Sequence, residues 1–127
     1  MVPFVIFMGA GLGGLSRYAL GNWIQSAAGT AFPWNTLAIN VSGSLMLTLI
    51  YGLLDSSAAG SPEWRAFLGI GFLGGYTTFS TFSYETVRQL QDGDWERAAV
   101  YILASVGLSL AAAVLGFRLA SGLLQRG

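Results

Sequence analysis

The chain has 127 residues, of which 54% are hydrophobic and only 9% are charged, a composition typical of an integral membrane protein rather than of a soluble domain. Six arginines balance six acidic residues, so no long-range field favours nucleic acid as a partner. Histidine and cysteine are both absent, which excludes disulfides, Cys/His metal sites and imidazole catalysis, and we do not expect an enzyme.

The first predicted span covers about residues 3–28 and contains GAGLGGLSRYALG. Gly9 and Gly13 are four residues apart and predict a face on which another helix packs closely. Arg17 lies inside this span, so its side chain either snorkels to the interface or faces a vestibule where it concentrates anions. The segment has no basic start and is long enough to span a bilayer, so we expect it to be retained rather than cleaved as a signal peptide.

The second predicted span covers about residues 34–54 and carries a polar residue at every fourth position: Thr36, Asn40, Ser44 and Thr48. At helical spacing these side chains form one polar stripe on an apolar surface. An amide at that depth is costly unless it has partners. Asn40 therefore either makes an interhelical hydrogen bond or offers its NH2 group to an anion on a polar path.

The third predicted span, about residues 64–90, contains the unusual stretch GIGFLGGYTTFSTFSY. Its glycines and hydroxyl residues weaken a helix, and we expect an interruption at residues 74–78. In a bilayer, non-helical backbone persists only where protein buries it or where it lines a cavity. Freed carbonyls there suit a hard cation, and the following amides and hydroxyls suit an anion. The alternative is a packing surface made by Gly71 and Gly75.

The fourth predicted span covers about residues 98–124 and has a second hydroxyl ladder, formed by Tyr101, Ser105 and Ser109. For either ladder taken alone, the default explanation is that the hydroxyls bond back to their own helix. The linker at residues 91–97 is short, so the third and fourth spans should be antiparallel neighbours. Near the end of the third span, Glu85 and Arg88 are spaced to form an ion pair.

Four spans in one domain, residues 1–127, place both termini on one side of the membrane. The arginines that flank the spans are nearly balanced between the two sides, so the positive-inside rule sets no orientation. Insertion in both orientations predicts an antiparallel homodimer with a two-fold axis in the membrane plane. Broken third helices that cross on this axis would supply carbonyl oxygens for a buried Na+.

Three stretches, GAGLGGLSRY, NTLAINVSGS and GFLGGYTTFSTFSYE, resemble the Fluc (CrcB) family of small bacterial fluoride channels. The resemblance covers essentially the whole chain, and GGxTTFSTF is a specific motif. It implies an all-α protein with four transmembrane helices per subunit, a broken third helix and a dual-topology antiparallel homodimer in the bacterial inner membrane. It also implies two parallel fluoride pores and a central Na+ that is structural and not transported.

By the family pattern, the fluoride pore is lined by these residues: Phe79, Phe82, Asn40, Tyr101, Ser105, Ser109 and Thr36. Arg17 and Glu85 would lie in or beside the vestibule, and the backbone oxygens of Gly74 and Thr77 would bind Na+. Aromatic rings carry positive potential at their edges, so the two phenylalanines can present C–H edges to an anion.

The function that the resemblance implies is passive fluoride efflux, driven by the negative interior potential, which lowers cytoplasmic fluoride and its toxicity. One alternative is a proton-coupled exporter of the small multidrug-resistance type. That mechanism needs a titratable carboxylate in the membrane, and Glu85 is the nearest candidate. A second alternative is an accessory subunit without transport activity, which would leave the ladders and the broken helix without a purpose.

Overall fold

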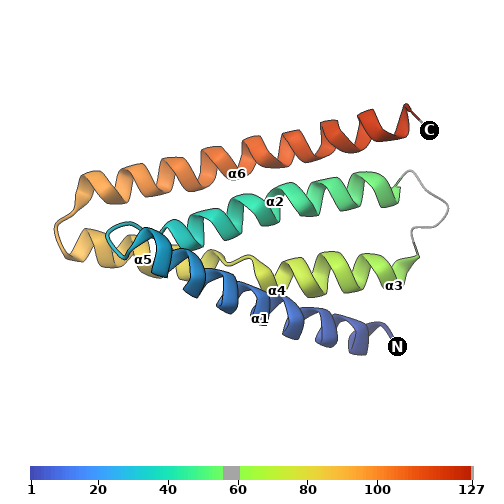
Figure 1. The fold of residues 1–127 in the computed structure, drawn as a ribbon, viewed down its shortest axis with the longest axis horizontal. Helices are drawn as coiled ribbons and strands as arrows, with labels where there is room; N and C mark the ends of the chain where they lie inside the picture. The colour runs from blue at the N-terminus through green and yellow to red at the C-terminus, as the bar shows by residue number, and fades with distance from the viewer. Residues whose placement is uncertain (56–60, 127) are drawn as a thin grey trace.

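The computed structural model describes residues 1–55 and 61–126 and consists of long helices that run side by side (Figure 1). The uninterrupted ones are α1 (Val2–Ala28), α2 (Trp34–Asp55) and α6 (Trp95–Leu124), and each is long and apolar enough to cross a membrane. The third span is an interrupted helix, which consists of α3 (Pro62–Trp64), the π-helix η1 (Arg65–Leu73), α4 (Gly74–Tyr76) and α5 (Phe79–Gln91). The prediction of an all-helical membrane protein with a broken third helix is confirmed, and both termini lie at one end (Figure 1).

Glycines end two of the helices. Gly29 takes a φ of 81° after α1, and Gly93 takes a φ of 78° after α5, a left-handed conformation that glycine adopts without steric cost. At the second site the Asp94 amide donates to the Gln89 carbonyl and the Gly93 amide donates to the Leu90 carbonyl, which is a Schellman motif. This tight turn makes α5 and α6 antiparallel neighbours, as the short linker predicted.

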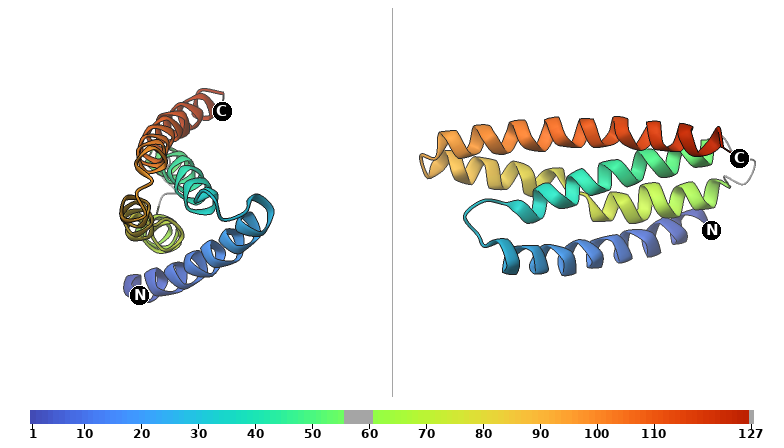
Figure 2. Two further views of the ribbon diagram at one scale, coloured as in Figure 1. Left: turned by 90° about the vertical axis from the view of Figure 1, so that its left-hand side faces the viewer. Right: turned by 45° about the horizontal axis from the view of Figure 1, so that its top comes forward.

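Helix α1 lies so close to η1 and α4 that their backbones meet at glycine positions. A Cβ atom built on Gly9 would lie 2.5 Å from the Phe67 oxygen, and one on Gly71 would lie 2.9 Å from the Ile6 oxygen. One on Gly75 would overlap the oxygen of Ala10. The predicted close-packing faces of the first and third spans therefore meet within this chain. On the other side, α2 lies along α6, as the views in Figure 2 show.

The third helix breaks at Thr77 and Thr78, which are extended, with ψ angles of 161° and 120°. Gly74, Gly75 and Tyr76 remain helical, so the break is shorter than the interruption predicted for residues 74–78. The Thr78 hydroxyl caps α5 by accepting a hydrogen bond from the Thr81 amide at 3.1 Å.

The π-helix that precedes the break was not anticipated. At its end the Gly74 amide donates to the carbonyl of Gly69, which is five residues back, whereas in an α-helix the acceptor is four residues back.

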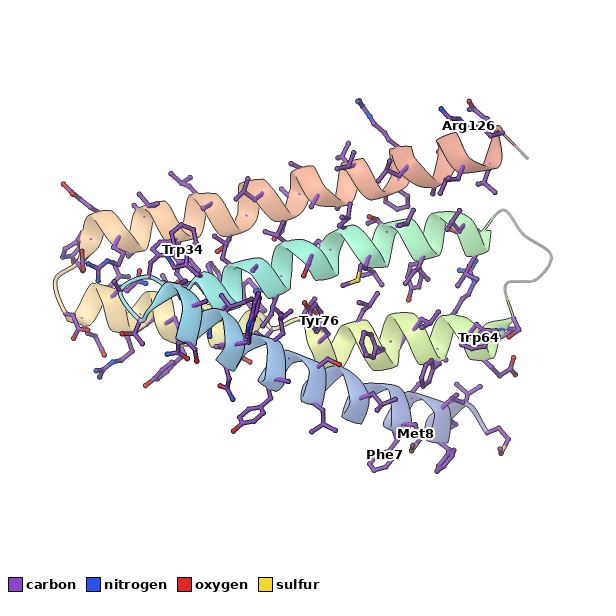
Figure 3. All side chains as sticks on the ribbon, viewed as in Figure 1. Phe7, Met8, Trp34, Trp64, Tyr76 and Arg126 are labelled. Atoms are coloured by element: carbon purple, nitrogen blue, oxygen red, sulfur yellow. The ribbon has the colours of Figure 1, made fainter. Side chains whose placement is uncertain are left out.

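Aromatic side chains mark the two ends of the helices. In Figure 3, Trp34 lies near one end, Trp64 and Arg126 lie near the other, and Tyr76 lies between them. Tryptophans at such levels are typical of membrane interfaces. The segment from Asp55 to Arg65 lies partly outside the described residues, and its two ends are joined by an ion pair between Arg65 and Asp55.

Candidate functional site

Asn40 on α2 holds the break in the third helix by a pair of hydrogen bonds. Its Nδ2 donates to the Thr78 carbonyl at 2.8 Å, and the Thr78 amide donates to its Oδ1 at 2.8 Å. Thr78 is only 8% exposed, so without these bonds its backbone groups would be buried and unsatisfied. Of the two alternatives for Asn40, the structure shows the interhelical hydrogen bond. Its other N–H group has no acceptor within residues 1–55 and 61–126 and can donate to a ligand.

The break changes the bonding of the backbone carbonyls. In a continuous helix the Thr78 amide would donate to Gly74, but here it donates to Asn40, which leaves the Gly74 carbonyl without its usual donor. The Thr77 carbonyl accepts a hydrogen bond from Nη1 of Arg17 at 3.3 Å. Arg17 therefore reaches inward to the break instead of snorkelling outward. It also borders a hollow of about 290 Å³ between α1, α2 and the break.

A second hollow, of about 280 Å³, lies beside the break between α2, α5 and α6. It brings together six of the predicted site residues, whose side chains or backbone line it: Asn40, Thr77, Phe79, Phe82, Ser105 and Ser109. We call it the polar hollow. The rings of Phe79 and Phe82 are adjacent, with centroids 5.5 Å apart, but Phe82 is 9% exposed whereas Phe79 is 77% exposed. One wall of the hollow is therefore open in this chain.

The two hydroxyl ladders differ in their hydrogen bonds. On α2, Ser44 donates to the Asn40 carbonyl at 2.8 Å and Thr48 donates to the Ser44 carbonyl at 3.0 Å, so this part of the stripe bonds to its own helix. On α6, the Ser105 hydroxyl is buried yet has no hydrogen-bond partner within residues 1–55 and 61–126. Buried hydroxyls are ordinarily paired, so an unpaired one beside a hollow indicates a site for a ligand or water.

Glu85 does not line the polar hollow but a separate hollow of about 370 Å³ nearer the α5–α6 turn. Its carboxylate accepts a hydrogen bond from Thr36 at 2.9 Å and one from the Tyr101 hydroxyl at 2.6 Å. The Tyr101 ring is fully buried and lies edge-on to Phe82, with centroids 5.2 Å apart. The ion pair that the spacing of Glu85 and Arg88 allows is not formed, because Glu85 turns inward to the two hydroxyls instead.

Sequence reasoning missed the role of Thr78, which caps α5 and also binds Asn40. The capping role could have been predicted from the sequence, since a threonine just before a helical segment is a common N-cap. The partner of Asn40 had no such signal, because it depends on which helix lies opposite. Within the described ranges no cluster of acidic side chains could hold a metal, so a cation here would have to use carbonyl oxygens.

Comparison with known proteins gives one consistent result. The family model described as "CrcB-like protein, Camphor Resistance (CrcB)" matches residues 4–117. A protein of Thermus thermophilus named "Fluoride-specific ion channel FluC" is 44% identical over 120 residues, which cover 94% of each chain. Proteins of the same name from Acidobacterium capsulatum and Geobacter sulfurreducens are 44% and 48% identical, over 87% and 78% of this chain and 89% and 80% of their own.

Proposed function

The chain belongs to the CrcB family of fluoride-specific ion channels, and on this basis we propose that it carries fluoride passively across the membrane through the polar hollow. It is a multi-pass membrane protein and not an enzyme. The observation that carries the assignment to this hollow is the Ser105 hydroxyl, which is 7% exposed and has no partner in the described part of the chain. A buried O–H donor without an acceptor is suited to an anion.

The lining of the polar hollow matches the chemistry of fluoride. This ion is small and strongly hydrated, so a pore has to replace its water with hydrogen-bond donors. Ser105, Ser109 and the free N–H of Asn40 are such donors, and the edges of Phe79 and Phe82 add positive potential. These are several weak contacts rather than one cationic site, which lets the ion leave as well as enter.

Passive conduction requires no coupling to protons or nucleotides. We place the protein in the bacterial inner membrane, where the negative interior potential drives fluoride outward and lowers its toxicity. Glu85 was the candidate carboxylate for a proton-coupled exporter. It accepts hydrogen bonds from two hydroxyls and does not line the polar hollow, which supports a structural role for it instead.

We infer that the open wall of the polar hollow is covered by a second copy in an antiparallel homodimer. Phe79 is 77% exposed at this wall, and the polar groups behind it would otherwise face hydrocarbon, where unpaired polar groups are costly. The balanced arginines at the two membrane faces permit insertion in both orientations. Two such hollows in a dimer give two parallel pores.

The break also fits the proposed structural Na+. The Gly74 carbonyl lacks its usual helical donor, and the Thr77 carbonyl has a second lone pair besides the one that accepts from Arg17, so both oxygens can act as ligands. Two carbonyls from each subunit would meet where the third helices cross. A bound Na+ would offset the negative ends of these carbonyl dipoles and so stabilise the dimer. Arg17, which donates to Thr77, would then lie close to the same site.

Halide efflux from liposomes containing only this protein tests the proposal. We expect fluoride efflux without chloride efflux, and loss of fluoride efflux in Phe82→Ile. Phe4→Ile is a matched control, because Phe4 is an exposed residue of α1 that does not line the polar hollow. The proposal fails if the folded protein passes no fluoride, if it passes chloride equally well, or if Phe82→Ile conducts like the wild type.

A further inference from the structure

The C-terminal turns of α6 carry a positively charged hollow that has no part in the proposed channel. It has a volume of about 180 Å³ and is lined by four residues of α6 and one in the turn that follows it: Arg118, Leu119, Gly122, Leu123 and Arg126. Residues four apart lie on the same side of a helix, so Gly122 separates the two arginines. A Cβ atom built on Gly122 would meet nothing within 4 Å, so the space between the arginines is open.

The two guanidinium groups of this hollow lack partners. Of the other arginines, Arg65 pairs with Asp55, Arg97 pairs with Asp94 at 2.9 Å, and Arg17 donates to a backbone carbonyl, whereas the Arg88 side chain makes no ion pair or hydrogen bond with the described residues. Within residues 1–55 and 61–126, the side chains of Arg118 and Arg126 make no ion pair or hydrogen bond, and no acidic side chain lines the hollow. Their positive charge is therefore available to an external anion.

The position of the hollow indicates which kind of anion could bind there. Arg126 and Trp64 lie at the same end of the helices (Figure 3), and Trp64 is exposed, as expected at a membrane interface. The face of α6 that packs on α2 is marked by the buried Gly116 and Ala120, and Arg118 lies away from it. A row of exposed leucines runs from the hollow toward the membrane centre: Leu123, Leu119 and Leu115.

We propose that this hollow binds the headgroup phosphate of an anionic phospholipid, with Arg118 and Arg126 on either side of the phosphate. Arginine is suited to phosphate because its planar fork donates two parallel hydrogen bonds. The leucine row provides an apolar track for the acyl chain, which a free phosphate ion would not use. The lipid site is independent of fluoride conduction, since none of its residues lines the polar hollow.

Native mass spectrometry of the full-length protein in detergent tests this site by measuring the affinity of the first bound lipid. We expect phosphatidylglycerol to bind more tightly than phosphatidylcholine. In the double variant Arg118→Gln/Arg126→Gln this affinity for phosphatidylglycerol should fall by about 10- to 30-fold, because each arginine near an anionic headgroup contributes severalfold. Gly122→Leu should also weaken binding, since it fills the hollow without a change of charge and favours the helix.

The matched control is Arg65→Gln/Arg97→Gln, which removes the same charge from two arginines that are already paired, and it should bind phosphatidylglycerol like the wild type. Equal binding of the two lipids, or unchanged binding in the Arg118/Arg126 variant, overturns the proposal. Displacement of the lipid by millimolar inorganic phosphate would assign the hollow to free phosphate instead. Loss of dimer in Gly122→Leu without a change in lipid affinity would assign it to a second copy of the chain.

Discussion

Two adjacent glycines of α1 offer a direct test of how the helix break is held in place. A Cβ atom on Gly13 would overlap the Phe72 oxygen and lie 2.9 Å from the Tyr76 nitrogen, whereas one on Gly14 would meet nothing within 4 Å. Ordinary van der Waals contact begins at 3.4 Å. In Gly13→Ala, α1 and the third helix therefore have to move apart until the new Cβ atom reaches that distance from the backbone opposite. The atoms in the way belong to backbone, so no side-chain rotation can relieve the overlap.

The expected change in the free energy of unfolding follows from two opposing effects. Both substitutions favour the helix by up to about 1 kcal/mol, because alanine replaces glycine. Only Gly13→Ala adds overpacking, which costs about 1–3 kcal/mol. We therefore expect Gly14→Ala to be as stable as the wild type or more stable, and Gly13→Ala to be less stable than Gly14→Ala by about 1–3 kcal/mol. Separation of the helices would also lengthen the bond from Arg17 to Thr77, one turn further along, and reduce fluoride efflux.

The assay is reversible unfolding in mixed micelles, followed by tryptophan fluorescence, together with fluoride efflux from liposomes. The free energy of unfolding is compared between the two alanine variants, which have the same composition. Equal unfolding free energies for Gly13→Ala and Gly14→Ala would refute the reasoning, because the backbone contact between α1 and the third helix would then not limit packing.

Three further substitutions probe the site itself. Asn40→Ala leaves the buried amide and carbonyl of Thr78 unpaired, and it should lower the free energy of unfolding by about 2–4 kcal/mol, measured by the same titration. An unchanged free energy of unfolding would mean that the hydrogen bonds from Asn40 do not stabilise the break. Tyr101→Phe removes the donor to Glu85, so fluoride efflux should change and stability should fall by about 1–3 kcal/mol; wild-type behaviour in both measurements would contradict a structural role for this contact. Arg17→Gln removes a positive charge beside the proposed Na+ site, and the Na+ concentration that gives half-maximal dimer, measured by cross-linking, should fall severalfold. A midpoint equal to that of the wild type would place Arg17 too far from the cation to affect it.

Much of the fold could be predicted because a bilayer admits few solutions. A chain with long uncharged apolar segments has to form helices that satisfy their own backbone, and glycines spaced by four have to mark close approaches. The break was also predictable, because consecutive Gly and Thr residues weaken a helix locally. These properties depend on neighbours along the chain, and the sequence contains them directly.

The partners of the polar side chains could not be predicted in the same way. Ser44 and Ser105 are the same residue type in similar ladders, yet Ser44 bonds to its own helix and Ser105 is left unpaired beside the polar hollow. Glu85 has Arg88 at helical spacing, yet it turns to Thr36 and Tyr101 on other helices. Each outcome depends on what lies across the helix interface.

The sequence by itself determined the class of protein, the number and limits of the apolar segments, the family and the region of the break. Only the tertiary structure decided that Asn40 binds the break, that Arg17 reaches a carbonyl within it, and that a π-helix precedes it. The physical reason is that helix formation is local, whereas a side-chain hydrogen bond forms with whichever group the packing of distant segments places within about 3 Å.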